Sequence, residues 1–326
     1  MLMAVHKRGD YKMVTNKKIS MCLFVVSLSC VAAHAGTFTI PDWLTSSTVF
    51  VMKGEQAKGT GLLMAVTDYN ATFCYLVTAK HVVKPLLSEQ SDKIAVRFNL
   101  KNSDKAKTIT FPARKFSTKR WIEHVNPAVD IAVIPLPIFG DIGELDVMMY
   151  KIQDANDQFL ETSNWLEKYK VGPGDQTFTL GLVPYLYTRD HENLVLSRFG
   201  AISLLPRKEI DLPDGKQKSY FLDCQAFPGN SGGPAFVLIE RSEKGTLITG
   251  WRFALLGVVT QFVPSPLRVE KVALKDDEKK TAIQLIENTG ITKVVPVDYL
   301  LDILFSEDQK SFRKSMAEQS KQKGNQ

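Results

Sequence analysis

Cysteine, histidine and net charge are all scarce in this chain of 326 residues, and each scarcity excludes a class of protein. The chain has only four cysteines, without a C-x-x-C pair, and its histidines do not cluster. We therefore expect no disulfide-rich framework, no metal site and no cofactor. The formal net charge of +6 is too small to predict nucleic-acid binding, which normally needs a clustered basic face.

The N-terminus lacks an apolar run long enough to span a membrane, because its apolar residues 21–32 are too few for that. Lysines precede this run and the A-x-A pattern of residues 33–35 follows it, which is typical of a cleaved secretory signal. We expect residues 1–35 to be a signal peptide. The mature chain would begin at Gly36 and be exported, to a periplasm or out of the cell, without stable membrane insertion.

Cleavage would also remove two cysteines and most of the net charge. Residues 1–35 hold five basic residues against one acidic residue, so the mature chain would carry 36 basic and 34 acidic residues, a net charge near +2. Cys74 and Cys224 would remain, each in an apolar segment, and we expect two buried free thiols, with a single disulfide as the alternative. Initiation at Met13 instead of Met1 would give a signal of ordinary length, and the sequence leaves this open.

The most informative motif is a serine in a glycine-rich turn, the sequence Pro-Gly-Asn-Ser-Gly-Gly-Pro at residues 228–234. Ser231 is the candidate nucleophile, and the backbone N–H groups of Gly229 and Ser231 are candidates for an oxyanion hole. A serine in such a segment is often only a turn residue, so the interpretation depends on finding a base and an orienting acid elsewhere.

His81 and Asp130 are the candidates for that base and acid. His81 follows a strand-like apolar run, and Asp130 opens the apolar segment 130–136 after a turn-like Asn-Pro pair. The motif also fits the G-x-S-x-G elbow of α/β-hydrolases, in which the serine precedes the acid and the histidine. No histidine follows Ser231 in this chain, so the order His, Asp, Ser favours a serine protease over an esterase.

Several blocks of the sequence resemble those of the trypsin-like (chymotrypsin-fold) serine peptidases, most closely the bacterial HtrA-like and glutamyl-endopeptidase-like branch. They are GTGLL at residues 59–63, LVTAKH at 76–81, DIAV at 130–133 and PGNSGGP at 228–234. The resemblance covers roughly residues 45–305 and implies two six-stranded antiparallel β-barrels, with His81 and Asp130 in the first and Ser231 in the second. Short apolar runs broken by Gly, Pro, Asn and Asp independently favour an all-β chain.

The resemblance implies a division of the mature chain into two barrels and a tail. The expected parts are residues 36–165, an N-terminal barrel with an inter-barrel insertion; 166–305, a C-terminal barrel ending in a short helix; and 306–326, a polar tail. Apolar positions at Val297, Leu300, Leu301 and Leu304 predict that helix. The tail is too short for the PDZ module that the HtrA-like branch often carries. Two stretches, 141–170 and 264–280, look like insertions that could gate the crevice.

Departures from the trypsin pattern bear on activation and specificity. Asn230 stands where proteases activated by a new N-terminus carry an aspartate, so that route of activation is not expected. The resemblance implies a substrate pocket formed by Gln225, Ala226, Thr260, Gln261 and Phe262. Gln225 replaces the acid of trypsin-type enzymes, which disfavours cleavage after Lys or Arg. Phe262 predicts a shallow pocket unless its ring turns outward, and both a small aliphatic residue and glutamate stay open as the preferred residue.

The sequence thus predicts an exported serine endopeptidase that acts on peptides or proteins. Ser231 would attack the peptide carbonyl and form an acyl-enzyme, with His81 as general base and then general acid, and with Asp130 orienting the imidazole. The alternative is a secreted protease-like binding or adhesion module without turnover. His124 and His191 lack comparable context and are interpreted as surface residues. The physiological substrate and the oligomeric state stay open.

Overall fold

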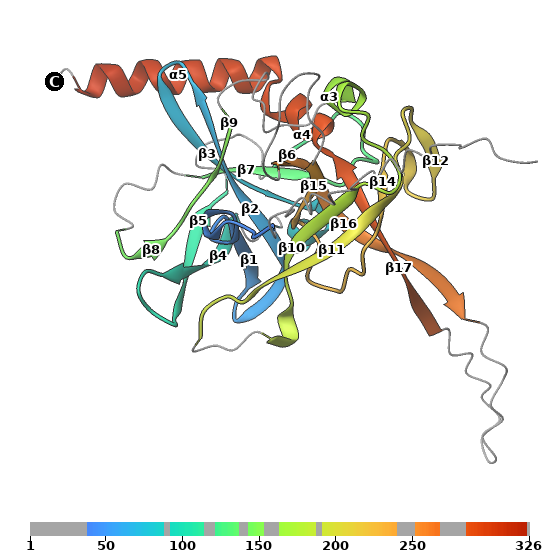
Figure 1. Ribbon diagram of the computed structural model, residues 1–326. Helices are drawn as coiled ribbons and strands as arrows, with labels where there is room; N and C mark the ends of the chain where they lie inside the picture. The colour runs from blue at the N-terminus through green and yellow to red at the C-terminus, as the bar shows by residue number, and fades with distance from the viewer. Residues whose placement is uncertain are drawn as a thin grey trace, which may run out of the picture. The chain divides into compact units, whose positions relative to one another are not determined.

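The chain folds into two β-units, antiparallel except for the parallel pair β2–β9, followed by two helices (Figure 1), which confirms the all-β, chymotrypsin-like prediction. The computed structural model describes residues 38–87, 92–113, 121–136, 143–152, 163–186, 191–239, 252–267 and 285–324. All of these residues lie in one compact part of the chain, Gly36–Gln326, which contains both β-units. The expected signal peptide and most of the stretch 264–280 lie outside the described residues. Among the helices that are described, none is long and apolar enough to cross a membrane.

The first unit is a sheet whose main path runs β5-β4-β1-β2-β3-β7-β6, with β8 paired to β4 and β9 to β2. Its strands are β1 (Thr48–Lys53), β2 (Gln56–Asp68), β3 (Ala71–Thr78), β4 (Lys93–Leu100), β5 (Ala106–Pro112), β6 (Ile122–Glu123), β7 (Ala132–Leu136), β8 (Leu145–Asp146) and β9 (Tyr150–Ile152). It has nine strands in place of the six expected: the main path has seven, and β8 and β9, from the stretch interpreted as an insertion, also pair with the sheet. Two one-turn helices accompany it, α1 (Asp42–Thr45) and α2 (Lys80–Val83).

The hairpin β2–β3 is the centre of this unit and leads to the candidate histidine. Its two-residue turn is Tyr69-Asn70, with φ of 51° and 60°, the left-handed geometry that matches the twist of a tight hairpin. Successive side chains of a strand point to opposite faces. Accordingly Tyr75 and Val77 of β3 pack in the central apolar cluster, whereas Leu76 packs in a second cluster on the other face.

The second unit is a closed barrel in the order β10-β11-β14-β17-β16-β15. Its strands are β10 (Gln176–Leu182), β11 (Val195–Leu204), β14 (Tyr220–Asp223), β15 (Pro234–Ile239), β16 (Arg252–Leu267) and β17 (Leu285–Pro296). Helix α3 (Ser163–Lys168) precedes the barrel and the 3₁₀ turn η1 (Pro184–Leu186) follows β10. A small separate hairpin, β12 (Ile210–Leu212) and β13 (Gly215–Gln217), interrupts it between β11 and β14.

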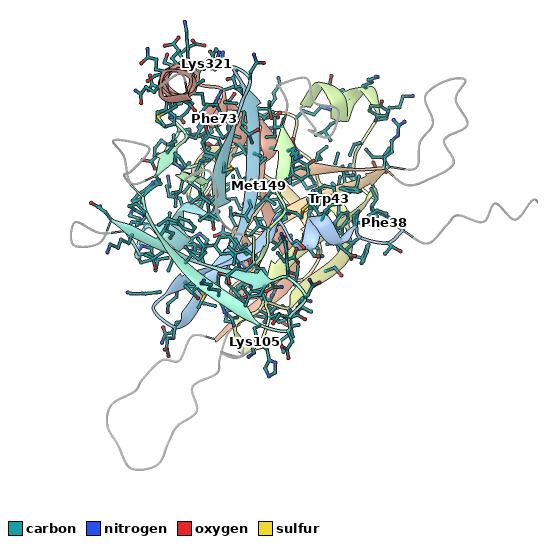
Figure 2. The ribbon with its side chains drawn as sticks, turned by 90° about the vertical axis from the view of Figure 1, so that its left-hand side faces the viewer. Phe38, Trp43, Phe73, Lys105, Met149 and Lys321 are labelled. Atoms are coloured by element: carbon teal, nitrogen blue, oxygen red, sulfur yellow. The ribbon has the colours of Figure 1, made fainter. Side chains whose placement is uncertain are left out.

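The C-terminal region contains the expected short helix α4 (Val297–Leu304), and its apolar side is buried in the central cluster. The structure differs from the expectation of a polar tail, because residues Glu307–Gly324 form helix α5 (Figure 2). Arg313 of α5 is fully buried, and its Nε atom donates to Asp68 Oδ2 at 2.9 Å at the end of β2. The described residues of α5 that are buried are Gln309, Arg313 and Ala317, so this face has few large apolar residues and the hydrophobic pattern did not predict the helix.

Cys74 and Cys224, the cysteines in the described part of the chain, are buried and free, as predicted from their apolar surroundings. Cys74 lies in the cluster of the first sheet and Cys224 in the interior of the barrel. Burial raises the pKa of the Cys74 thiol to about 11, and it also raises the pKa of Cys224. Both groups are therefore protonated and unreactive near neutral pH.

Candidate active site

The register of the first sheet brings His81 and Asp130 together. Strand β7 pairs with β3 so that Ala132 lies opposite Thr78. His81 comes just after the end of β3, and Asp130 comes just before the start of β7. His81 Nδ1 is 2.7 Å from Asp130 Oδ2, and the backbone N–H of His81 donates to Asp130 Oδ1 at 2.9 Å. An ionised carboxylate can only accept a hydrogen bond, so this contact favours the neutral tautomer with the hydrogen on Nδ1, which leaves Nε2 as the acceptor on the ring. This is the tautomer that a general base for a hydroxyl requires.

The serine loop depends on two glycines with left-handed backbone, Gly229 with φ 103° and Gly232 with φ 91°. A Cβ atom at Gly232 would lie 2.0 Å from the carbonyl oxygen of Thr60 and 2.1 Å from Thr78 Oγ1. No side chain fits there. The loop can therefore approach the first sheet closely only with glycine at this position. Ser231 is the residue directly before this contact.

Asn230 holds the loop from inside. It is buried, its Oδ1 accepts from the N–H of Phe227 at 2.8 Å, and its Nδ2 donates to the carbonyl of Leu182 at 3.3 Å. The N–H of Gly233 donates back to the carbonyl of Asn230 at 3.0 Å. These bonds give the asparagine a structural role in shaping the turn around Ser231.

Thr60 of β2 fixes the same loop from the other unit. Its Oγ1 donates to the carbonyl of Gly229 at 2.7 Å and accepts from the N–H of Leu182 at 3.0 Å. Its backbone N–H donates to the carbonyl of Ser231 at 2.9 Å. One threonine therefore joins the serine loop, the end of β10 and the first sheet. The block GTGLL drew attention to this strand, but not to the role of the hydroxyl.

The backbone carbonyls of Gly229 and Ser231 both accept hydrogen bonds from Thr60. Within the ranges that the structure describes, the N–H groups of these two residues donate to no protein acceptor. Donors that are held in place but have no internal partner are what an oxyanion hole needs.

The Ser231 hydroxyl is directed at the strand beside it. Its Oγ donates to the carbonyl oxygen of Thr260 at 2.8 Å. Thr260 is the extra residue of a β-bulge, since the register of β16 against β17 shifts between Val259 and Gln261. The bulge turns this carbonyl towards the serine. Proton transfer to His81 would require Oγ to rotate away from Thr260.

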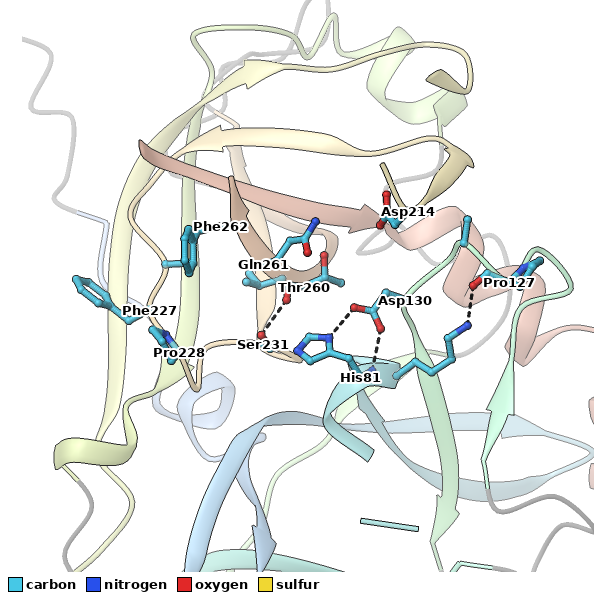
Figure 3. Close-up of a pocket in the computed structure, with 14 residues that line it drawn as sticks. His81, Pro127, Asp130, Asp214, Phe227, Pro228, Ser231, Thr260, Gln261 and Phe262 are labelled. Atoms are coloured by element: carbon cyan, nitrogen blue, oxygen red, sulfur yellow. Dashed lines mark hydrogen bonds and ion pairs between the residues drawn. The ribbon is translucent and has the colours of Figure 1, made fainter. Parts of the chain in front are cut away.

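The three candidates line one cleft of about 480 Å³ (Figure 3), a volume within the usual range for ligand sites. Four of the five predicted pocket residues also line it: Ala226, Thr260, Gln261 and Phe262. Gln225 is exposed and is not part of this lining. The ring of Phe262 is half-buried and packs against the core of the barrel, so it forms part of the wall of the cleft.

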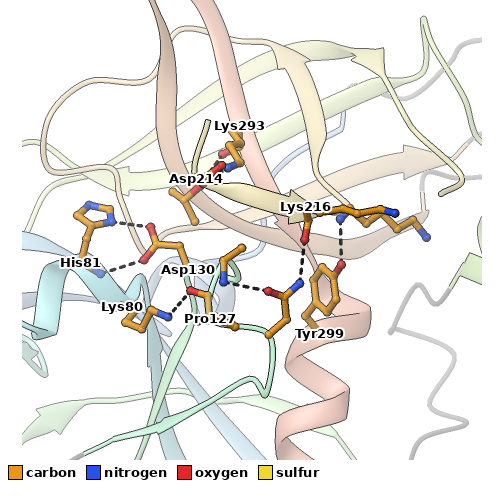
Figure 4. A network of polar contacts seen from close by, with 12 residues as sticks. Lys80, His81, Pro127, Asp130, Asp214, Lys216, Lys293 and Tyr299 are labelled. Carbon is orange, nitrogen blue, oxygen red and sulfur yellow. Dashed lines mark hydrogen bonds and ion pairs between the residues drawn. The ribbon is translucent and has the colours of Figure 1, made fainter. Parts of the chain in front are cut away.

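Asp214, at the turn of the hairpin β12–β13, also lines this cleft and was not predicted (Figure 4). The hairpin contacts the loop that leads to Asp130. The Nδ2 of Asn126 donates to the carbonyl of Lys216 at 2.9 Å, and Gly215 approaches Ala128 closely. The Pro-Asp-Gly sequence of the turn signals a hairpin. No feature of the sequence places that hairpin beside His81.

The other two described histidines differ from each other. His191 is exposed, as interpreted from the sequence. His124 is mostly buried, with its ring centroid 4.8 Å from that of Tyr299 and its Nε2 3.5 Å from Asp302 Oδ2 on α4. It therefore joins β6 to the C-terminal helix and is not a surface residue. In the described part of the chain, no cluster of three or more His, Cys, Asp or Glu residues could hold a metal ion.

No family profile matches the chain, and no curated protein matches it in sequence. Solved structures of low similarity do match. The MamO protease domain from Magnetospirillum magneticum is 14% identical, with a TM-score of 0.43 over 79% of this chain and 96% of that one. An inactive mutant form of Rv3671c from M. tuberculosis H37Rv is 15% identical (TM-score 0.39; 80% and 86% covered). The serine protease domain of the Sesbania mosaic virus polyprotein is 14% identical (TM-score 0.38; 80% and 94% covered).

Proposed function

We propose that this chain is an exported serine endopeptidase that hydrolyses peptide bonds through His81, Asp130 and Ser231. The observation that carries the proposal is the Nδ1 contact of 2.7 Å between His81 and Asp130, in the same cleft as the serine. This contact leaves Nε2 as the ring acceptor, on the side chain that lies between Asp130 and Ser231 in Figure 3. A serine in a turn has no physical need for an oriented imidazole at its side.

The reaction follows from these positions. Oγ of Ser231 leaves Thr260, gives its proton to His81 Nε2 and bonds to the peptide carbonyl carbon. The carbonyl oxygen becomes negative and accepts from the N–H groups of Gly229 and Ser231, while Asp130 stabilises the imidazolium. His81 then protonates the leaving amine as the C–N bond breaks. Water attacks the acyl-enzyme with His81 again as base, which releases the acid and restores the serine.

The strand β16 supports a peptide as the substrate. Its segment up to Val258 pairs with β15, and Val259 bonds to the serine loop through the carbonyl of Gly233 and the N–H of Gly232. From Gln261 onward, the described strand pairing of β16 is with β17 alone. The edge of β16 that faces away from β17 begins, in this part of the strand, at the cleft, whose lining includes Thr260, Gln261 and Phe262. An extended peptide can add to such an edge as a further strand, with its side chains alternating into and out of the cleft.

Export and the kinship with the HtrA-like and glutamyl-endopeptidase-like branch rest on the sequence alone. The signal pattern of residues 1–35 and the four motif blocks support them. Peptide mapping of the mature protein recovered from a periplasmic fraction or culture medium would test export, with Gly36 as the expected first residue.

Fluorophosphonate labelling tests the enzyme proposal. The protein from Gly36 onward is treated with the probe, beside a Ser231→Ala variant shown to be folded by circular dichroism and thermal unfolding. We expect the wild type to be labelled on the peptide that contains Ser231, and the variant to stay unlabelled. A well-folded wild type that is not labelled would contradict the proposal and favour the binding-module alternative.

A further inference from the structure

Asp214 places a second carboxylate in the cleft, and neither the triad nor the oxyanion donors use it. Its Oδ2 atom is 2.5 Å from the Nζ atom of Lys293, which comes from β17. Across the described ranges, Oδ1 of Asp214 makes no hydrogen bond, and 38% of the side chain is exposed. A carboxylate held in place on one oxygen and open on the other can accept from a bound ligand.

The ion pair has a defined direction. The side chain of Lys293 is only 3% exposed and is not part of the cleft lining, although Lys293 pairs with Gln261, which is. The ammonium is thus buried and the carboxylate faces the cleft. A ligand in the cleft meets the negative end of the pair, which favours a cation or a hydrogen-bond donor.

The other charges that line the cleft are already engaged. Both oxygens of Asp130 bond to His81. The ammonium of Lys80 donates to the carbonyl of Pro127 at 2.9 Å and is 3.2 Å from Glu123. Asp214 is therefore the charged group of the described lining that has an open acceptor.

The cleft is also polar at one end and apolar at the other. Figure 3 shows Asp214 on the side of Pro127, away from Phe227, Pro228 and Phe262, with Ser231 and His81 between the two ends. A peptide that crosses the serine would meet aromatic side chains at one end and a carboxylate at the other.

We propose that Asp214 is a specificity-determining residue, which selects peptides with a cationic nitrogen at the end of the cleft opposite Phe262. The inference rests on the proposed peptidase function. The cation belongs to a residue displaced from the scissile bond, so it is separate from the preference at the bond itself. Lysine or arginine side chains and the free α-ammonium of a peptide share this chemistry.

A matched peptide series tests the proposal. Internally quenched peptides of one cleavable sequence carry either Lys or neutral norleucine at each position around the scissile bond, in N-acetylated and free-amine forms. The proteins compared are the wild type, Asp214→Asn, the double variant Asp214→Asn with Lys293→Met, and Asp211→Asn. Asp211 is an exposed carboxylate on the same hairpin that is absent from the cleft lining, so its variant controls for the change in net charge.

We expect the wild type to prefer Lys over norleucine by about tenfold in kcat/KM at one displaced position, and less at high salt. Asp214→Asn should abolish that ratio and Asp211→Asn should keep it. The double variant removes the buried ammonium together with its partner, so it should also lose the ratio even if the single variant is destabilised. A preference confined to free-amine peptides would identify the α-ammonium as the selected group.

Two results would overturn the inference, and they differ from each other. If the wild type is labelled by fluorophosphonate but shows no preference for a cation at any position, or if Asp211→Asn and Asp214→Asn lose it equally, the role of Asp214 is wrong while the peptidase function stands. If the folded wild type is neither labelled nor able to cleave any peptide, the proposed function fails and the specificity inference fails with it.

Discussion

His81 and Asp130 bond directly to each other, whereas the loop of Ser231 is held by contacts from both units. The register of β3 against β7 brings the base and the acid into contact, and both hydrogen bonds between them join segments that flank these two strands. The serine loop belongs to the barrel, but Thr60 of the first sheet bonds to the carbonyls of Gly229 and Ser231. The base and its acid should therefore tolerate changes at the interface that displace the nucleophile.

Of the changes to the His81–Asp130 pair, Asp130→Asn should cause the largest loss of activity. The amide cannot stabilise the imidazolium and can favour the wrong tautomer, so we expect kcat/KM to fall about 10⁴-fold with the fold retained. Hydrolysis kinetics and thermal unfolding measure the two effects. Asp104→Asn, an exposed site in the β4–β5 turn, is the control and should behave as the wild type. A loss of less than tenfold would show that Asp130 is not the orienting acid.

Gly232→Ala is the corresponding break on the serine side. The new Cβ atom would meet the Thr60 carbonyl at 2.0 Å and require a left-handed alanine, so the loop must move away from β2. We expect at least a hundredfold loss of fluorophosphonate labelling rate and a lower melting temperature. Gly172→Ala, where nothing lies within 4 Å of the new atom, serves as the control. Unchanged labelling would mean that the loop is not held as described.

Thr60→Val sharpens the comparison because it removes only the hydroxyl. Gly229 loses a donor to its carbonyl and the N–H of Leu182 loses its acceptor, which should cost about 1–3 kcal/mol of unfolding free energy. Activity should fall roughly tenfold to a hundredfold through misplacement of the loop. Thr67→Val, exposed on the same strand, should change neither. Restoration of activity by Thr60→Ser would assign the effect to the hydroxyl, and a silent Thr60→Val would refute it.

Changes at the two buried thiols should have the smallest effect on stability. Their reactivity tests whether the interiors of both units exclude solvent equally. Burial raises the pKa of Cys74 to about 11 from its ordinary value of 9.0, so folding favours the protonated thiol. This contribution to stability is complete below pH 9 and is lost as the pH rises towards 11. At pH 8, a thiol reagent should react with neither cysteine until the protein is unfolded. Cys74→Ala should weaken the alkaline loss of stability, and rapid reaction of the native protein would contradict the burial.

Different parts of the molecule were predictable to different extents. The strand pattern predicted an all-β chain, and the order of three short blocks named His81, Asp130 and Ser231, which the structure brings to one cleft. Helix α4 followed from its apolar spacing. Helix α5 did not, because its buried face consists of polar and small residues around Arg313, which bonds to Asp68. His124 looked like a surface residue because its partners on α4 are distant in sequence.

The sequence by itself determined which residues have the chemistry of a nucleophile, a base and an acid, and where the chain must turn, because glycine, proline and apolar periodicity act over a few neighbouring residues. Only the tertiary structure decided that Thr60 supports the serine loop, that Ser231 bonds to a bulged carbonyl, and that Asp214 enters the cleft. The two hydrogen bonds join residues that are 29 and 169 positions apart in the sequence. Asp214 reaches the cleft on a separate hairpin. These contacts depend on strand register and on the packing of the two units, which no local pattern specifies.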